Sequence, residues 1–252
     1  MAAPLACTSP LADQPADAGA PTPLGNGKRI RDVMNPTSAP KSGASVTITG
    51  ASFLWVDTFD ETNDGKSAGT VYLQDTGSTA AYSGASLYQP TYIPANLAPA
   101  PGDVLDLVGT YQAETSIGAA TFNQGEALIQ ISKPQVTFRF EYLVPPAAVI
   151  NVTDLNDYAK GQQWQAMLVT VNDVTLGSGF QNVNGRVTAY LTSTISGSSV
   201  EMSNELFDLS AWNAKAATKV TTGTKLKSLT GIVTWFTQYH IAPRSAADIV
   251  LE

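Results

Sequence analysis

The stretch GASVTITGASFLWVDTF at residues 43–59 decides the fold. Apolar and polar residues alternate along most of it, as in a half-buried β-strand, and Gly50 interrupts the alternation. We therefore predict a strand over residues 45–56 that bends at Gly50. The stretch GQQWQAMLVTVNDVTLG at residues 161–177 has a similar pattern and predicts a second long strand at 164–176. The second half of the chain is therefore expected to repeat the plan of the first.

A second pair of similar stretches supports this internal repeat. GDVLDLVGTY at 102–111 is similar to GTKLKSLTGIV at 223–233, and each carries a glycine two residues after a leucine. A repeat about half the chain long indicates two copies of one small domain rather than one large enzyme core. The predicted organisation is an N-terminal segment at 1–27, a first domain at 28–143 and a second domain at 144–252.

The composition narrows the function classes. Apolar residues make up 43% of the 252 residues, enough for a core in each half, while charged residues make up only 14%. The formal net charge of -7 repels phosphate backbones and disfavours nucleic acid as a partner. Cys7 is the only cysteine, so an intrachain disulfide is impossible, and His240 is the only histidine, which excludes multi-histidine metal sites.

The N-terminal segment differs in composition from the rest. Residues 2–27 are rich in Ala, Pro, Ser, Gly and Asp, and they carry too little apolar surface to fold, so we predict a disordered tether. A cysteine followed by such a tether is typical of a lipid-anchored bacterial surface protein after signal removal. Cys7 is therefore a candidate lipidation site, with APLA at 3–6 only loosely fitting a lipidation box. The alternative is that Cys7 is incidental.

Short predicted strands fill both halves. The alternation in QVTFRFEYL at 135–143 predicts that Val136, Phe138, Phe140 and Tyr142 share one face. One short helix is expected at 152–159. The remaining predicted strands are 69–75, 86–92, 103–114, 127–131, 186–194, 199–210, a hairpin over 225–243, and 249–251. Many short strands with glycine-marked bends indicate an all-β chain of small barrels. We predict two tandem small β-barrels resembling the oligonucleotide/oligosaccharide-binding (OB) type, after a disordered N-terminal tether.

Four stretches carry a resemblance to a known group. QWQAMLVTVNDVTL at 163–176 and the ending LTGIVTWFTQYHIAPRSAADIVL at 229–251 resemble OB-like modules of secreted bacterial proteins. RIRDVMNPTSAPKSGASVTITGASF at 29–53, with GTVYLQD at 69–75, is similar to a sister module. Such modules often stand beside extracellular endonuclease/exonuclease/phosphatase-family nuclease domains, for which this sequence has no room. The resemblance implies a binding or structural role in a secreted, periplasmic or outer-surface protein.

An acidic loop between two predicted strands concentrates oxygen ligands of the kind that calcium prefers. Its candidate ligands are Asp57, Asp60, Glu61, Asn63 and Asp64. Counted as an EF-hand from Asp60, the loop has Val71 where the bidentate acid should stand, so it is not an EF-hand. Ca²⁺ is the one cofactor weighed here, and a plain solvated hairpin loop is the alternative.

Aromatic residues of the first half form a candidate ligand platform, because OB barrels stack ligands on the face of strands two and three. The candidates are Trp55, Tyr72, Tyr82, Tyr88 and Tyr92. The alternative is that they line the core. Lys66 is the only nearby base among several carboxylates, so a polysaccharide or a protein fits this surface better than nucleic acid.

The only histidine could combine with Arg244 and Asp248 in a catalytic group. However, no Gly-x-Ser-x-Gly turn occurs, and Ser245 with Asp248 is spaced to cap a turn. We therefore expect no enzyme activity. The leading hypothesis is a non-catalytic surface protein that binds polysaccharide or protein and meets a membrane only through a lipid anchor. The alternatives are a single-stranded nucleic-acid-binding or nuclease-accessory protein, and a calcium-dependent structural protein.

Overall fold

The computed structural model describes most of the chain after the N-terminal segment. The described residues are 27–57, 59–60, 63, 65, 69–88, 99–115, 127–193, 200–216 and 218–252. The predicted tether, apart from Gly27, and the candidate lipidation site Cys7 lie outside the described residues, so both stay predictions. The described part consists mostly of strands with a few short helices, which confirms the all-β prediction in its coarse form.

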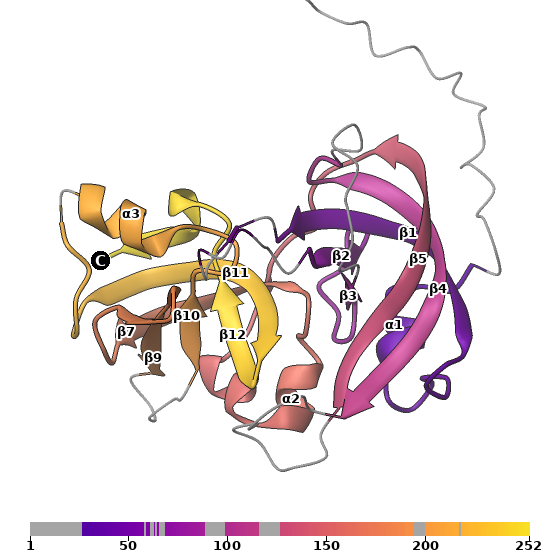
Figure 1. The fold of residues 1–252 in the computed structure, drawn as a ribbon, viewed down its shortest axis with the longest axis horizontal. Helices are drawn as coiled ribbons and strands as arrows, with labels where there is room; N and C mark the ends of the chain where they lie inside the picture. Colours follow the sequence, from indigo (N-terminus) through magenta and orange to yellow (C-terminus); the bar gives the residue numbers. More distant parts are fainter. Residues whose placement is uncertain are drawn as a thin grey trace, which may run out of the picture.

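The first half is a closed five-stranded β-barrel, drawn in indigo to rose in Figure 1. The strands are hydrogen-bonded in the order β1-β2-β3-β5-β4, and β4 pairs back with β1. All neighbours are antiparallel except β3 and β5, which run parallel. The elements are α1 (Ile30–Met34), β1 (Ser45–Val56), β2 (Val71–Asp75), β3 (Gly84–Tyr88), β4 (Asp103–Thr115) and β5 (Ala127–Glu141).

The first strand has the bend that its sequence predicts. Gly50 adopts a positive φ of 71°, and the pairing of β1 with β4 shifts register between Ile48 and Ala51. The buried carboxylate of Asp106 accepts a hydrogen bond from the Gly50 N–H (2.9 Å) and forms an ion pair with Arg139 (2.7 Å). The bulge in β1 is therefore held by a side chain from β4 that is itself clamped by β5.

The fifth strand departs from the prediction of a single apolar face. Val104 pairs with Phe140 but the next residue, Leu105, pairs with Phe138, so Arg139 is the extra residue of a bulge. Because neighbouring residues of β4 point to opposite faces, Phe138 and Phe140 do so as well. The prediction that the four alternating residues share one face is therefore wrong, since Arg139 is drawn out of the alternation toward Asp106.

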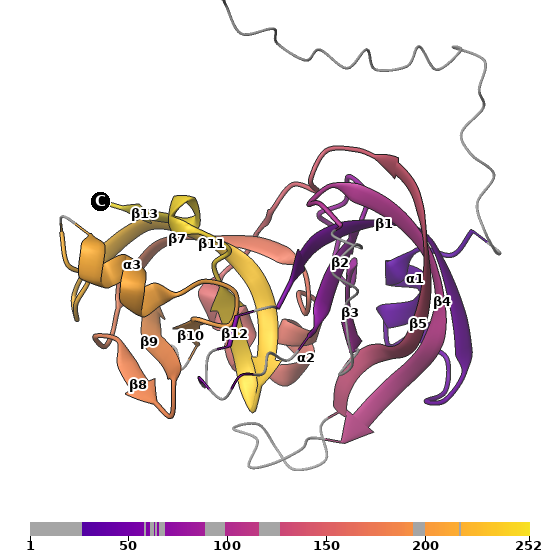
Figure 2. The ribbon, with the colours of Figure 1, turned by 45° about the horizontal axis from the view of Figure 1, so that its top comes forward.

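A short helix packs against the barrel core, as Figure 2 shows. The apolar side chains of α1, Ile30, Val33 and Met34, are all buried in that core. Asp75 at the end of β2 accepts hydrogen bonds from the N–H groups of Ile30 (2.8 Å) and Arg31 (3.2 Å). A carboxylate from a distant strand thus satisfies the exposed donors of the first helical turn. Burial nevertheless raises the pKa of Asp75 above its ordinary value.

The second half, as far as the structure describes it, contains four short helical segments and eight strands, of which three (β6, β8 and β13) lie outside its main ring. They are β6 (Ala148–Val149), η1 (Val152–Asn156), α2 (Tyr158–Gln162), β7 (Leu168–Leu176), β8 (Gln181–Val183), β9 (Arg186–Ser193), β10 (Glu201–Ser203), α3 (Leu209–Lys215), β11 (Lys225–Phe236), β12 (Gln238–Ala242), η2 (Ala246–Asp248) and β13 (Ile249–Leu251). The pairings run β7-β9-β10-β12-β11 and return from β11 to β7. Only β10 and β12 run parallel in this ring, at the place that β3 and β5 occupy in the first half. The hairpin predicted over 225–243 is confirmed by β11 and β12.

Each half has its own apolar core, and a third cluster joins them. This joining cluster contains Leu54 and Tyr72 from the first half, with Ala166, Leu168, Leu206, Ile232 and Ala242 from the second. The two halves therefore lie side by side in direct contact, as Figure 1 shows. The predicted domain boundary at 143/144 falls in the irregular segment between β5 and β6.

Candidate functional site

The second half covers the β2–β3 side of the first-half barrel. The Leu168 N–H donates to Oε1 of Gln74 (2.8 Å), and the Tyr82 N–H donates to the Gln163 carbonyl (2.7 Å). A Cβ atom on Gly84 would lie only 2.3 Å from the carbonyl oxygen of Gln165. The backbones of the two halves therefore approach each other at β3 as closely as a glycine permits.

The contact between the halves buries part of the predicted aromatic platform. Tyr72 is only 7% exposed, within the cluster that joins the halves, and Trp55 packs partly buried against the same cluster. Tyr82 packs partly buried on the first-half core. Tyr72 is therefore not available for stacking on a ligand, because the second half already occupies it. The side chain of Tyr88 and the whole of Tyr92 lie outside the described residues.

The acidic loop is described only in part. Asp57 is buried, Asp60 accepts a hydrogen bond from the Gly65 N–H (2.6 Å), and Asn63 is exposed with a positive φ of 57°. Glu61 and Asp64 lie outside the described residues. Within the described ranges, no group of three or more His, Cys, Asp or Glu side chains could hold a metal ion. Calcium at this loop stays a prediction.

A cleft of about 250 Å³ opens on the second half. It lies over β9, β10 and β12, between the tip of the β8–β9 hairpin and the tip of the β11–β12 hairpin. The side chains that give it chemistry are Arg186, Glu201, Ser203, Glu205, Phe236 and His240. In the order of pairings, β9 and β10 correspond to β2 and β3 of the first half. The strands that carry the cleft thus correspond to those covered in the first half.

Both hairpin tips are fixed by local backbone chemistry. Asn184 and Gly185 have φ values of 54° and 89°, as the tight turn between β8 and β9 requires. Asn204 ties this turn to the end of β10, because its Nδ2 donates to the Gly185 carbonyl (3.1 Å) and its Oδ1 accepts from the Val187 N–H (2.9 Å). At the other tip, Thr237 has a φ of 62°, a strained conformation for a β-branched residue.

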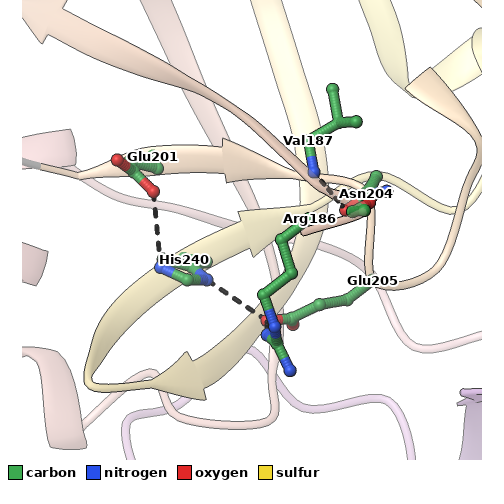
Figure 3. Close-up of polar contacts among 7 residues, drawn as sticks. Arg186, Val187, Glu201, Asn204, Glu205 and His240 are labelled. Atoms are coloured by element: carbon green, nitrogen blue, oxygen red, sulfur yellow. Dashed lines mark hydrogen bonds and ion pairs between the residues drawn. The ribbon is translucent and has the colours of Figure 1, made fainter. Parts of the chain in front are cut away.

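His240 lies between two carboxylates, as Figure 3 shows. The parallel pairing of β10 and β12 sets it beside Glu201, and its Nε2 lies 3.7 Å from Oε2 of that residue. Its Nδ1 lies 3.2 Å from Oε1 of Glu205. Arg186 approaches the same Glu205 oxygen at 3.8 Å and lays its guanidinium 3.5 Å from the centre of the Phe236 ring. Together these side chains form one polar chain along the cleft.

The electrostatics keep Glu205 ionised. Burial alone would raise the pKa of Glu205, but the hydrogen bond and charge of His240, with the charge of Arg186, bring it below its ordinary value. On the rim, the charge of Glu201 and, to a smaller degree, burial raise the pKa of the Tyr190 phenol. Glu205 is therefore a carboxylate at neutral pH, while Tyr190 keeps its proton.

One buried hydroxyl at the cleft has no hydrogen-bond partner within the described structure. Ser203 is only 2% exposed, and its Oγ makes no such bond there. A buried polar atom that lacks a partner is uncommon in native proteins and costs free energy. Ser203 therefore marks a position in the cleft where an added polar group would be stabilising.

The group His240, Arg244 and Asp248 does not assemble. Arg244 and Asp248 form their own two-point ion pair (2.8 and 3.0 Å), and Ser245 caps the following turn by accepting from the Ala247 N–H. The partners of His240 are Glu201 and Glu205 instead. Sequence reasoning missed both carboxylates, because only the parallel pairing of β10 with β12 brings them to the histidine. The cleft therefore offers two carboxylates as hydrogen-bond acceptors, the Arg186 cation and the exposed Phe236 ring, a combination that suits a polar ligand.

Within the described chain, no helix has the length and apolar character needed to cross a membrane. Neither a protein-family model nor a curated protein matches the sequence.

Proposed function

We propose that this chain is a non-catalytic binding protein made of two OB-like barrels, and that its second barrel binds polysaccharide over β9, β10 and β12. The first half supports the OB assignment through its closed ring with one parallel pair. The second half supports it because its pairings repeat that order and return to β7. The resemblance of residues 30–252 to OB-like modules of secreted bacterial proteins points the same way.

The observation that carries the proposal is that two strands are covered in the first half, while the corresponding two strands carry an open cleft in the second half. OB-type barrels bind oligonucleotides and oligosaccharides on the face of their second and third strands. In the first half these strands, β2 and β3, are covered by the second half through Tyr72, Gln74 and Gly84. In the second half the corresponding β9 and β10 carry an open cleft.

The chemistry of the cleft favours a sugar. Glu201, Glu205 and Arg186 supply hydrogen-bond acceptors and donors, and Phe236 at 45% exposure supplies an apolar ring face beside them. A cleft of about 250 Å³ is smaller than the roughly 300–1,000 Å³ typical of pockets for drug-sized molecules, so one residue of a polymer would enter it. The two carboxylates and the net charge of -7 oppose a phosphodiester backbone, which makes single-stranded nucleic acid the weaker alternative.

A protein ligand is the second candidate, and one observation favours it. Val183 and Phe236, at the tips of the two hairpins, are 66% and 45% exposed and flank the cleft. Such apolar side chains beside a polar floor would suit an extended peptide.

Location is part of the same proposal: the predicted tether and Cys7 support a secreted or lipid-anchored surface protein.

Binding of soluble polysaccharides by the full chain, measured by affinity electrophoresis and calorimetry, tests the proposal. Phe236→Ala should weaken binding by about tenfold, because stacking on an aromatic ring contributes roughly 1–3 kcal/mol. Phe140→Ala is the matched control, since this ring is similarly exposed (38%) but lies on the first half. The proposal fails if no polysaccharide binds, or if the two variants lose affinity equally.

A further inference from the structure

Among the described residues that line it, the cleft of the second half holds two carboxylates, Glu201 and Glu205, but only one permanently charged cation, Arg186. From this imbalance and the contacts below, we infer that the cleft selects a polysaccharide that carries free amino groups, with one sugar ammonium seated at the two carboxylates. This inference rests on the proposed polysaccharide-binding function and narrows its ligand.

The ion pairs of the cleft are longer than two partly buried arginine pairs elsewhere in this protein. The carboxylates lie 3.7 Å and 3.2 Å from the ring nitrogens of His240, and Arg186 lies 3.8 Å from Glu205. Elsewhere, Arg139 meets Asp106 at 2.7 Å, and Arg244 meets Asp248 at 2.8 Å. Charge-assisted hydrogen bonds normally have lengths of about 2.7–2.9 Å. The cleft carboxylates therefore keep capacity for a closer cation.

The position of Arg186 explains part of this greater length. Its guanidinium lies over the Phe236 ring, 3.5 Å from the ring centre, rather than in a two-point contact with Glu205. A cation stacked on a ring is stabilised there by the negative face of the π system. Arg186 thus neutralises Glu205 only at a distance, and the described lining of the cleft has two carboxylates against this one permanent cation.

The buried hydroxyl of Ser203 is an independent sign of a missing ligand. Its Oγ has no hydrogen-bond partner within the described structure, although the residue is 2% exposed and lines the cleft. An ammonium group has three N–H donors and no acceptor. Two carboxylates and the Ser203 hydroxyl form a set of acceptors. Such a set therefore suits an ammonium group better than it suits a neutral sugar hydroxyl or an acetamide.

The surroundings favour an amino group on a sugar polymer over one on a protein. Arg186 covers one face of the Phe236 ring, but the side chain is still 45% exposed at the cleft and offers apolar ring surface to a sugar ring. The net charge of -7 attracts a polycation as a whole and speeds its approach. A lysine-rich chain shares the charge but not the flat ring, so it serves as the discriminating comparison.

Calorimetry in a mildly acidic buffer, where both the sugar amine and Glu205 are ionised, tests this inference on the full chain. The probes are the hexamers of glucosamine, N-acetylglucosamine and glucose (cellohexaose), together with hexalysine. The glucosamine hexamer should bind at least about tenfold more tightly than each of the other three, with an affinity that falls as salt rises. Glu205→Gln should remove most of this preference.

The variants are chosen to separate recognition from folding. Glu201→Gln removes the less buried carboxylate and should reduce the preference even if Glu205→Gln fails to fold. Glu141→Gln, an exposed site on β5, makes the same change in net charge and should leave binding unaltered. Equal or tighter binding of the neutral hexamers overturns the inference but keeps the proposed function. Hexalysine binding as tight as glucosamine binding overturns the choice of a sugar, and no binding of any sugar overturns both proposals.

Discussion

The closest approach between the two halves gives the sharpest prediction, the effect of Gly84→Ala. The new Cβ would lie 2.3 Å from the carbonyl oxygen of Gln165 and 2.7 Å from the carbonyl carbon of Ala166. Both are backbone atoms, so neither can rotate away as a side chain would. The halves must separate at this point, which exposes part of the cluster around Tyr72 and stretches the hydrogen bond from Leu168 to Gln74 (2.8 Å).

The magnitude follows from these contacts. Overpacking in a tight contact costs about 1–3 kcal/mol. Strained or lost hydrogen bonds at Gln74 and Gln165 add about 1 kcal/mol each, for a total of roughly 3–5 kcal/mol. In a chain of this size, each kcal/mol lowers the melting temperature by about 2–4 °C, so the shift should be roughly 6–20 °C.

Differential scanning calorimetry measures this shift, with Gly179→Ala as the matched control. A Cβ on Gly179 meets nothing closer than 3.8 Å, so that variant should melt like the parent protein. If Gly84→Ala melts within a degree or two of Gly179→Ala, the docking described here is not the one that the protein adopts in solution. A split into two transitions would show that the halves have become independent.

Two further predictions concern buried charges. The folded-state pKa of Glu205 lies below the ordinary 4.5, so its carboxylate contributes stability above that pH, and this stability is lost as pH falls through the folded-state pKa. Glu205→Gln should therefore reduce the fall in the free energy of unfolding at acidic pH, as measured by urea denaturation. Asp106→Ala should destabilise the protein by about 3–5 kcal/mol in the same assay, because Arg139 and the Gly50 N–H lose their buried partner. The comparison is Glu252→Ala, which breaks an exposed pair with Lys225 and should cost about 0–1 kcal/mol; an equal loss in both variants would contradict the role given to Asp106.

Local sequence signals were sufficient where burial follows the strand period. The strand over 45–56 was predictable because buried and less buried residues alternate up to Ile48, and its bend because glycine tolerates the positive φ of Gly50. Beyond the bend, residues 51–54 are all buried, and Leu54 packs in the cluster that joins the halves. By contrast, the strand expected over 199–210 ends at Ser203 as β10. Asp208 then caps α3 by accepting from the Ala211 N–H (2.8 Å), a local signal that the alternation obscured.

The candidate site was not predictable from local pattern because tertiary contacts define it. Tyr72 was a candidate for the aromatic platform, with a place in the core as the alternative, and the second half buries it. Glu201 and His240 are distant in the chain, and they become neighbours only through the parallel pairing of β10 and β12. A reading of the sequence finds the residue types of a ligand face, but it cannot show which of two similar faces stays open.

The contrast between the two faces also explains why they can have different roles within one chain. The face of β2 and β3 suits backbone docking, because Gly84 leaves room and Tyr72 adds apolar area. The face of β9 and β10 instead carries Glu201 and, just beyond β10, Glu205. A further barrel that docked there in the same way would have to remove both carboxylates from water, at a cost of several kcal/mol for each ion. This polar surface therefore disfavours the docking of a further domain and leaves the cleft accessible to a small polar group that can satisfy the charges it buries.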